Sequence, residues 1–533
     1  MLVVGLGPVG SAAANIAGAL GLSCLGVDAS QSVFGLPRAI HYDAEIMRIF
    51  QSVGLAGQIE AISRVTRGSV HLGVDGEPIR DFRVEPARGH FGWYPHYLFH
   101  QPQLDQLLRE EAQERPGVDI LLGWECTHVV QDADGVEAWL SDPSGARRRV
   151  RARHLIACDG ASSRVRSQLG IELFDYGFEE PWLVVDLLVP SEELGPDYMV
   201  AHCDPSRPVV HVPAPGRHRR WEFMLLPGET AAEMAEPARA LELVGAAAPW
   251  LDVTSSELVR SAVYVFHGLV ARTWSEGRVM LAGDAVHQTP PFYGQGMCHG
   301  IRDVHNLLWK LAMIRSGEAS PALLATYQRE REPHVRTVIE AAVENGRYIC
   351  VLDPEEARRR DEEYRRRASD GTDVRSWRGV IPGLEAGLIH AGAEPSPAVG
   401  ALLPQPRVRD GDGAWALLDE MLGARFAIVG IGAVRASLRA RFEDELDGVV
   451  ISVARPGEPV ADTDRVEAEP GLLRAWFEDH DCTWAIVRPD RYVFGVASRS
   501  DELETLIEEL QRMLGATPSA ADEDEELTQL SSR

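Results

Sequence analysis

The chain has 533 residues, of which 45% are hydrophobic, so it can bury the cores of two or three domains. Its formal net charge of -27 argues against a nucleic acid or an anionic membrane as a partner. The seven cysteines are scattered without CxxC spacing, which predicts neither a disulfide framework nor a metal site and fits a cytoplasmic protein. No apolar run approaches the roughly 18 residues of a membrane span.

The N-terminus carries a pattern that is typical of dinucleotide binding. A short apolar strand, LVVG, leads into a glycine turn and a helix, and LSCLGVD predicts a second strand that ends at Asp28. Gly5, Gly7 and Gly10 form a GxGxxG turn, in which the backbone approaches the pyrophosphate while the acidic residue binds a ribose. The pattern does not distinguish NAD from FAD. The alternative is a glycine-rich turn in an unrelated βαβ unit.

A second motif, LIACDGASSRVRSQLG, occupies residues 155–170. An apolar strand ends at Asp159 and Gly160, and Ser163 and Arg166 follow. A carboxylate and small residues at the end of a strand suit a ligand crevice in an α/β sheet. The alternative is an ordinary turn into a helix, with the aspartate as its cap.

Residues 174–270 change in character and predict a separate sheet. WLVVDLLV, PVVHVPA and RWEFMLL are strand-like runs with little helix between them. Because side chains alternate along a strand, Trp221 and Phe223 share one face of RWEFMLL and Glu222 lies on the other. We expect Trp221 and Phe223 to line the substrate pocket, with a plain sheet core as the alternative.

A third motif, GRVMLAGD, predicts a strand that delivers Asp284 to its carboxyl end. Pro291 stiffens the loop that follows, and Gly294 and Gly296 allow a flat ligand to approach the backbone. A helix predicted from about Gly296 would point its positive end at that ligand, which favours negative charge such as that of a reduced flavin. The loop is therefore expected to cradle an isoalloxazine ring.

The rest of the chain predicts a long helical stretch, a connector and a small domain. Helix is expected from about 296 to 347, with interruptions at Pro321 and Pro333. Residues 351–400 combine a charged helix with a Gly/Pro-rich connector, and 401–515 have the strand and helix signals of a small α/β domain. Residues 516–533 are polar and acidic and predict a disordered tail.

The three motifs, in this order, resemble those of the FAD-dependent aromatic hydroxylases typified by para-hydroxybenzoate hydroxylase. HQPQLDQLLR, RRWEFMLLPGE and GQGMCHGIRDVHNLLWKL resemble the 3-(3-hydroxyphenyl)propionate hydroxylase branch. WAIVRPDRYVFG resembles that branch's thioredoxin-like domain but lacks CxxC. The resemblance implies an α/β fold: a Rossmann-like FAD-binding domain (1–173 and 271–350), an interleaved β-rich substrate domain (174–270), and a thioredoxin-like α/β domain (401–515).

The resemblance also implies roles for individual residues. FAD would be held by Gly5, Gly7, Gly10, Asp28, Arg38, Gln101, Cys126, Asp159, Arg166, Gly283, Asp284, Gly294, Gly296 and Met297. Apart from the resemblance, His41, Tyr42, Tyr293 and His299 lie in segments that are expected to approach the flavin; His41 and Tyr293 are the catalytic candidates, with His41 as a base toward the substrate hydroxyl. A hydrogen-bonded structural histidine is the alternative for His41. Trp221, Phe223 and Pro291 would contact the substrate.

The resemblance implies a monooxygenase in which NADH or NADPH reduces FAD, and molecular oxygen forms a flavin hydroperoxide that hydroxylates a phenol. The reductant would bind transiently, since a single GxGxxG is present. The expected substrate is 3-(3-hydroxyphenyl)propionate or a related phenol, and a homodimer is a further expectation. The alternatives are a tailoring hydroxylase for a polyketide or other natural product, a non-catalytic FAD-binding protein, and an NAD-dependent dehydrogenase.

Overall fold

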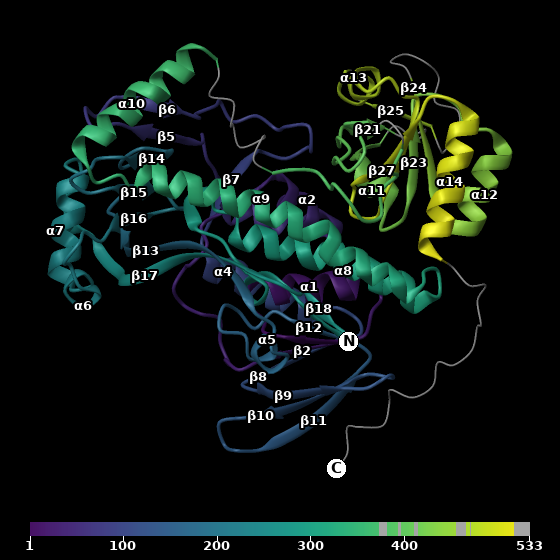
Figure 1. Cartoon of the computed structure of the whole chain (residues 1–533), viewed down its shortest axis with the longest axis horizontal. Helices are drawn as coiled ribbons and strands as arrows, with labels where there is room; N and C mark the ends of the chain where they lie inside the picture. The colour runs from purple at the N-terminus through teal and green to yellow at the C-terminus, as the bar shows by residue number, and fades with distance from the viewer. Residues whose placement is uncertain (372–380, 393–395, 410–413, 455–464, 469–470, 516–533) are drawn as a thin grey trace.

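The structure is a computed structural model that describes residues 1–371, 381–392, 396–409, 414–454, 465–468 and 471–515. Figure 1 shows an eight-stranded sheet on the left, the C-terminal sheet at the upper right, and two long helices, α8 and α9, between them. No described helix is both long and apolar enough to cross a membrane. The acidic tail expected at 516–533 lies outside the described residues.

A six-stranded sheet carries the N-terminal glycine turn. Its order is β18 (Ser275–Glu276), β19 (Val279–Leu281), β12 (Leu155–Ala157), β1 (Leu2–Val4), β2 (Cys24–Asp28) and β8 (Val118–Leu122). All neighbours are parallel except β18 and β19. This confirms the predicted parallel α/β arrangement, with all three motifs at the carboxyl ends of adjacent strands.

Four helices connect or cover this sheet: α1 (Pro8–Ala19), α4 (Gln101–Gln113), α5 (Arg164–Gln168) and α8 (Gly296–Ser316). The buried face of α1 consists mainly of glycine and alanine, so the helix lies close to the strands. Beside the sheet lie a three-stranded sheet of β9 (Glu125–Gln131), β10 (Val136–Ser141) and β11 (Arg147–Ala152), and a second one of β3 (His41–Asp43), β7 (His96–Phe99) and β4 (Ser63–Val65). Helices α2 (Ala44–Ser52) and α3 (Ala56–Ala61) follow β3.

The eight-stranded sheet is the predicted substrate sheet, but it extends beyond residues 174–270. Its order is β20 (His287–Gln288), β17 (Glu257–Ala271), β13 (Leu173–Leu188), β16 (His218–Met224), β15 (Val209–Val212), β14 (Met199–His202), β5 (Ser69–Leu72) and β6 (Pro78–Asp81). Strands β5, β6 and β20 come from segments that the sequence prediction gave to the FAD-binding domain. Strand β14 pairs with β15 on one side, and β5 pairs with its other side in parallel register, with Ser69 opposite Met199.

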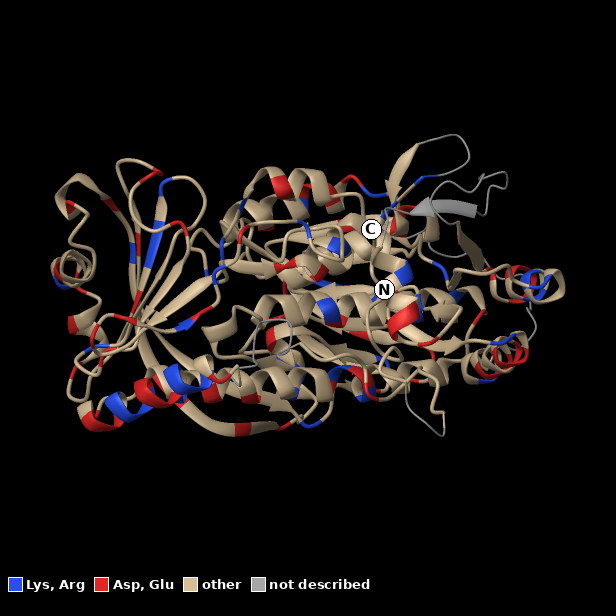
Figure 2. Ribbon diagram, turned by 90° about the horizontal axis from the view of Figure 1, so that it is seen from above, with Lys and Arg blue, Asp and Glu red and all other residues tan. Residues whose placement is uncertain are grey.

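Helices cover both the outer face and the edge of this sheet. The outer face is covered by α6 (Ala231–Met234) and α7 (Pro237–Ala247), and the short helix η1 (Val253–Ser255) leads into β17. Helix α10 (Pro354–Ser369) crosses near β6, and Figure 2 shows acidic and basic residues mixed along it. Its buried Arg360 donates to the carbonyl of Cys203 at 2.7 Å, so the first part of the predicted connector packs on the sheet.

The long helical stretch breaks at one of the two expected prolines. Helix α8 ends at Gly317, which has a φ of +80°, and Pro321 then starts the short helix η4 (Pro321–Ala325). Pro333 lies inside α9 (Thr326–Ile349), so the expected interruption there was wrong. A proline removes one backbone hydrogen bond, and the buried residues on both sides of it, such as Tyr327 and Val335, hold the helix in place.

The C-terminal domain contains a mixed seven-stranded sheet in the described part of the chain. Its order is β22 (Trp415–Leu417), β21 (Arg407–Arg409), β25 (Arg465–Ala468), β24 (Val449–Ala454), β23 (Ala427–Gly430), β26 (Trp484–Val487) and β27 (Val493–Ala497). The helices are α11 (Leu418–Leu422), α12 (Ala436–Leu446), α13 (Leu472–Asp479) and α14 (Ser500–Leu514). This matches the predicted small α/β domain; its thioredoxin-like character and the domain boundaries stay predictions.

Candidate functional site

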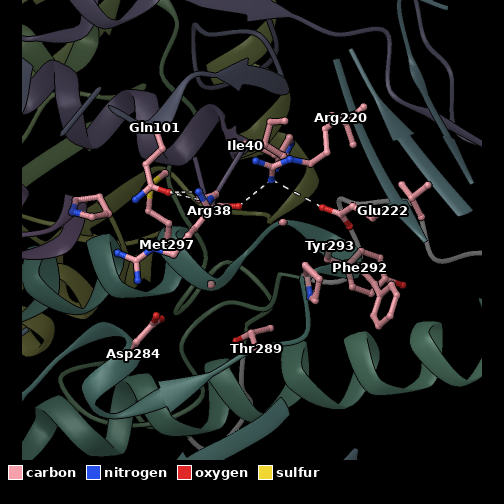
Figure 3. Close-up of a pocket in the computed structure, with 18 of the residues that line it drawn as sticks. Arg38, Ile40, Gln101, Arg220, Glu222, Asp284, Thr289, Phe292, Tyr293 and Met297 are labelled. Carbon is pink, nitrogen blue, oxygen red and sulfur yellow. Dashed lines mark hydrogen bonds and ion pairs between the residues drawn. The ribbon is translucent and has the colours of Figure 1, made fainter. Parts of the chain in front are cut away.

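A cavity of about 320 Å³ lies where the six-stranded sheet, the eight-stranded sheet and the start of α8 meet. At one end it is lined by the glycine turn and at the other by β5, β14, β15 and β16. Figure 3 shows Arg38, Gln101 and Met297 on one side of this cavity, Arg220 and Glu222 on the opposite side, and Asp284 and Thr289 below. The three motifs and the substrate sheet therefore share one space.

The glycine turn needs each of its glycines for a different contact. A Cβ on Gly5, whose φ is +89°, would lie 2.4 Å from the carbonyl oxygen of Cys158, and one on Gly10 would lie 1.8 Å from that of Gly5. Gly7 lines the cavity, and a Cβ there would meet no atom within 4 Å. Gly5 and Gly10 thus allow the strand and helix to pack, while Gly7 leaves its cavity side open to a ligand.

Asp28 supports the glycine turn from behind. Its Oδ2 accepts hydrogen bonds from the backbone N–H of Leu6 at 2.7 Å and from Arg109 at 3.3 Å, and its Oδ1 accepts one from the N–H of Ser30 at 2.7 Å. Asp28 does not line the cavity. Cys126 is buried in β9 and also lies outside the cavity lining. Contacts of these two residues with a ribose and an adenine stay predictions.

Gln101 holds the segment that contains Arg38. Its side-chain oxygen accepts hydrogen bonds from the backbone N–H groups of Arg38 at 2.8 Å and Ala39 at 2.7 Å. The guanidinium of Arg220 holds the same segment from the other side, donating to the carbonyls of Arg38 at 2.9 Å and Pro37 at 2.5 Å. The exposed Arg38 side chain and the buried Gln101 both line the cavity.

The second motif joins two loops of the cavity wall. Asp159 accepts hydrogen bonds from Ser163 Oγ at 2.5 Å and from the N–H of Val165 at 3.2 Å, and Ser163, not the aspartate, caps the helix α5 that follows. Arg166 donates to the carbonyls of Ala161 at 2.8 Å and Ala285 at 3.0 Å, so it ties this turn to the loop of Asp284. Cys158 and Gly160 line the cavity between them. Direct contacts of Asp159 and Arg166 with FAD stay predictions.

The third motif is organised by a buried aspartate of α8. The carboxylate of Asp303 accepts from the N–H of Gly283 at 3.1 Å, bonds to His287 Nε2 at 2.7 Å, and accepts from Arg331 Nε at 3.0 Å. Gly283 has a φ of +62°, which a glycine adopts without strain. Asp284 follows it and lines the cavity, and its side chain is accessible from there. Its position deep among protein atoms raises the pKa of its carboxyl by burial.

The start of α8 forms the wall opposite the glycine turn. Gly294, Gly296 and Met297 line the cavity, and a Cβ on Gly296 would meet no atom within 4 Å. Gly294 has a φ of +60°, and a Cβ there would lie 3.0 Å from the side chain of His41. The positive ends of α1 and α8 both face this space, which suits the negatively charged parts of a flavin dinucleotide.

His41 lines the cavity but is poorly suited to act as a base. The ring is 2% exposed, and its Nε2 lies 3.1 Å from His96 Nδ1. Burial lowers the pKa of His41 to about 4, whereas an effective base has a pKa near the working pH. The geometry supports the alternative of a structural histidine. Tyr293 is buried in the cavity wall beside Val338, and its catalytic role stays a prediction.

The expected pocket role of Trp221 and Phe223 is corrected by the structure. Both side chains are 1% exposed and pack in the core between the sheet and α7, with Leu243 among their neighbours. Neither residue lines the cavity. The alternation along β16 was predicted correctly, but α7 covers the face that carries the aromatic residues. Pro291 does line the cavity, as expected.

The opposite face of β16 brings Arg220 and Glu222 into the cavity. Arg220 is 2% exposed and pairs with Asp186 at 2.8 Å, and a Glu222 oxygen lies 3.8 Å from the guanidinium of Arg220. Burial raises the pKa of Glu222. His71, on β5, lines the same end, and burial lowers its pKa to about 3, so it is neutral at physiological pH. This end of the cavity therefore combines the carboxyl group of Glu222, an arginine that is already paired with Asp186, and the neutral His71.

Sequence reasoning missed several residues that shape the site: Arg220, Glu222, His71, Gln295 and Asp303. Glu222 was recognised only as lying opposite Trp221, and Asp303 and Gln295 were quoted only within a segment that resembles a family. The two-residue period of β16 was the one signal that could have identified Glu222. His71 had no such signal, because β5 joins this sheet from a distant part of the chain.

Comparisons with known proteins agree with this geometry. Residues 1–342 match the family model described as FAD binding domain, and residues 400–513 match the one described as HcaD C-terminal domain. The chain is 36% identical to a probable NADH-specific resorcinol 4-hydroxylase of Rhodococcus jostii (strain RHA1), over 97% of this chain and 95% of that protein. It is 33% identical, with the same coverage, to a 3-(3-hydroxy-phenyl)propionate/3-hydroxycinnamic acid hydroxylase of Klebsiella pneumoniae (strain 342).

Among solved structures, the flavin-dependent monooxygenase PieE in complex with FAD and substrate has the same fold. The TM-score is 0.80 at 21% identity, and the match covers 97% of this chain and 99% of that one. With the relatives above, these matches show that the chain belongs to the FAD-dependent aromatic hydroxylases. It is a flavoprotein monooxygenase, and FAD is its cofactor. The dehydrogenase and non-catalytic alternatives are thereby set aside.

Proposed function

We propose that this monooxygenase hydroxylates a small, uncharged phenol such as resorcinol. One observation carries the proposal: the cavity runs without a break from the dinucleotide turn at Gly7 to Glu222 on the substrate sheet. A substrate carboxylate at that end would meet the carboxylate of Glu222. The guanidinium of Arg220 shares Asp186 with Arg260 and already donates to Asp186 and to the carbonyls of Pro37 and Arg38. A neutral hydroxyl, in contrast, can donate a hydrogen bond to Glu222.

The cofactor is expected to lie along the cavity wall described above. Gly7 and the start of α1 would hold the pyrophosphate, Arg38 and Gln101 would flank the cofactor, and Asp284 would bind ribityl hydroxyls. Gly294, Gly296 and Met297 would contact the ring. When bound, FAD supplies the hydride acceptor and the oxygen chemistry, while the protein orients the phenol and excludes water.

Glu222 is our candidate for the group that binds and activates the substrate hydroxyl. Its raised pKa makes the carboxylate a stronger base than an ordinary glutamate. A hydrogen bond from the phenol to this carboxylate draws the proton toward Glu222 and increases electron density on the ring. His41, whose pKa is about 4, is less suited to that task.

The size of the cavity favours a single-ring substrate over a polyketide. About 320 Å³ lies at the lower end of the range for ligand pockets, and this space also has to receive the flavin ring. Apolar side chains close the sheet end; they are Met199, Ala201, Val210, Val212 and Ile349. The tailoring-hydroxylase alternative is thus the less supported one.

The remaining partners follow from the same proposal. NADH is the proposed reductant, by analogy with the NADH-specific relative, and molecular oxygen is the proposed oxidant. A reductant of this kind and seven cysteines that form no disulfide suit the cytoplasm. The predicted homodimer stays a prediction.

The test is anaerobic stopped-flow mixing of the holoenzyme with NADH or NADPH, followed by flavin absorbance. We expect resorcinol to accelerate flavin reduction strongly and, with oxygen admitted, to be hydroxylated, whereas 3-(3-hydroxyphenyl)propionate has a much smaller effect. In the variant Glu222→Gln, the two phenols should differ less in how much they accelerate flavin reduction, because the charge that repels the substrate carboxylate is removed. A stronger response to the carboxylate substrate would refute the substrate class, and peroxide without product from every phenol would refute the proposal as a whole.

A further inference from the structure

The C-terminal sheet inserts one hairpin end into the FAD-binding part of the chain. The turn between β26 and β27 contains Arg488, Asp490, Arg491 and Tyr492, and each of them is at most 5% exposed. Arg491 has a φ of +71°, an uncommon conformation for a residue with a side chain. Figure 1 shows this sheet beside α2 and α8. The hairpin end is thus a buried contact between two parts of the fold.

Two residues of this turn bind side chains of the long helices α8 and α9. Arg488 pairs with Glu330 of α9 at 2.8 Å, and Asp490 accepts a hydrogen bond from Trp309 Nε1 of α8 at 3.0 Å. Glu330 also pairs with Lys310 at 2.7 Å. None of these residues lines the cavity, so this part of the contact holds the sheet against the helices.

A third residue of this turn, Tyr492, leads to the cavity wall through a chain of buried bonds. Its hydroxyl donates to Glu45 Oε1 at 2.9 Å, and Glu45 Oε2 accepts from Arg302 Nε at 2.6 Å. Arg302 then donates to Gln295 Oε1 at 2.9 Å and to Asp43 Oδ2 at 2.6 Å, and Gln295 Nε2 donates to Asp43 Oδ2 at 3.1 Å. Every link of this chain is a side-chain bond.

The chain branches at Arg302, and both branches end beside residues that line the cavity. Gln295, which is fully buried, stands between Gly294 and Gly296. Asp43 follows His41 by two positions on β3, and Gly294 lies directly against the His41 ring. The bonds of Gln295 and Asp43 to Arg302 therefore fix the two facing parts of this wall relative to each other.

The charges of Asp43, Glu45 and Arg302 explain why the hydroxyl of Tyr492 is needed. Burial opposes the charge on Arg302, but Asp43 and Glu45 outweigh it and keep the pKa of this guanidinium well above its ordinary value. Two carboxylates thus share one arginine, which leaves a buried acceptor on Glu45 that needs a further donor. Burial and Glu45 raise the pKa of Tyr492, so its hydroxyl keeps its proton and supplies that donor.

We propose that Tyr492 is a positioning residue for the flavin: the C-terminal domain completes the FAD site by holding Glu45, Arg302 and Gln295 behind the wall of Gly294–Met297. The contact does not depend on which phenol is the substrate. It assigns to the C-terminal domain a role in cofactor geometry, in addition to any role in stability.

The test compares Tyr492→Phe with Trp309→Phe in the full-length protein. Each variant loses one hydrogen bond to a buried carboxylate across the same contact, but only Tyr492 is linked to Gln295. Three quantities are measured on apoprotein prepared by removing FAD: the melting temperature, the FAD dissociation constant by fluorescence titration, and hydrogen–deuterium exchange of a peptide spanning 291–300.

We expect both variants to melt at a lower temperature than the wild type. Tyr492→Phe alone should weaken FAD binding about five- to tenfold and should speed exchange in 291–300. This is less than the full effect of losing a hydrogen bond to a charged group, because Tyr492 acts on the wall only through Glu45 and Arg302. Trp309→Phe should leave the FAD dissociation constant within about twofold of the wild type. The hydrogen bond from Trp309 to Asp490 is not linked to Gln295, so its loss should lower only the stability of the fold.

Two results would overturn the proposal: an unchanged FAD dissociation constant in Tyr492→Phe, or equal losses of affinity in both variants. If Tyr492→Phe does not accumulate as folded protein, Glu45→Gln replaces it. This variant keeps an acceptor for Tyr492 but weakens the hold on Arg302, so it should also weaken FAD binding and speed exchange in 291–300. Normal affinity in Glu45→Gln would equally refute the chain of contacts.

Discussion

Two glycines of α8, one turn apart, should separate cofactor affinity from the stability of the fold. A Cβ on Gly300 would lie 2.4 Å from a methyl of Val9 and 2.9 Å from the Cα of Gly283. Gly300→Ala therefore forces α8 away from the glycine turn, at a cost of about 1–3 kcal/mol for overpacking, which the better helix propensity of alanine offsets by at most about 1 kcal/mol. The apoprotein should be measurably less stable to urea.

A Cβ on Gly296 would meet no protein atom within 4 Å and would occupy the cavity. Gly296→Ala should leave the stability of the apoprotein unchanged or slightly higher. If the flavin ring lies against this wall, the same steric cost of about 1–3 kcal/mol falls on binding and raises the FAD dissociation constant roughly 5- to 150-fold. Urea unfolding of the apoprotein and FAD titration measure the two effects. Normal FAD affinity in Gly296→Ala would refute the proposed place of the ring.

Three other variants test the electrostatics. Burial raises the pKa of Asp105 to about 6 from an ordinary 3.8, so its contribution to stability is complete below about pH 4 and is lost as the pH rises through 6. The free energy of unfolding of Asp105→Asn, relative to that of the wild type, should therefore rise by about 2 kcal/mol between pH 4.5 and pH 7.5. A difference between variant and wild type that is the same at the two pH values would contradict this. Glu222→Gln should lower turnover of resorcinol about 100-fold or more and remove a rise of activity with pH, without changing the flavin spectrum; an unaltered pH profile would exclude Glu222 as the base. Glu330→Gln should cost about 3–5 kcal/mol in urea unfolding, because Lys310 and Arg488 lose their buried partner, and a loss below about 1 kcal/mol would show that water replaces it.

The cofactor half of the site could be predicted from the sequence because its signals are local. A strand, three glycines and a helix define the turn at Gly5–Gly10, and the loop at Gly294 and Gly296 is identified by its glycines alone. Gly7, Gly294 and Gly296 line one cavity, while Gly5 and Gly10 allow the strand and the helix beside it to pack. Local patterns of this kind depend on backbone geometry, which neighbours along the chain determine.

The substrate half could not be predicted because distant segments form it. The alternation on β16 is visible in the sequence, but only the position of α7 decides that Trp221 is buried and that Glu222 faces the cavity. Tyr492 and Glu45 are 447 positions apart, and neither has a neighbour in sequence that suggests the other. Contacts of this kind depend on how whole elements pack, which no short pattern records.

The parallel pairing of β5 with β14 has a consequence for synthesis in the cell. Residues Ser69–Leu72 leave the ribosome long before Met199–His202, their partner, is made. At 5–20 residues per second the delay is roughly 7–26 s, during which β5 can pair with β6 but the side that faces β14 has no partner strand. Tyr492 is made later still, so, with the role proposed for Tyr492, the flavin site is complete only after residue 492 has been made. Slowing or pausing the ribosome after β5 would lengthen the period in which chaperones must protect that strand.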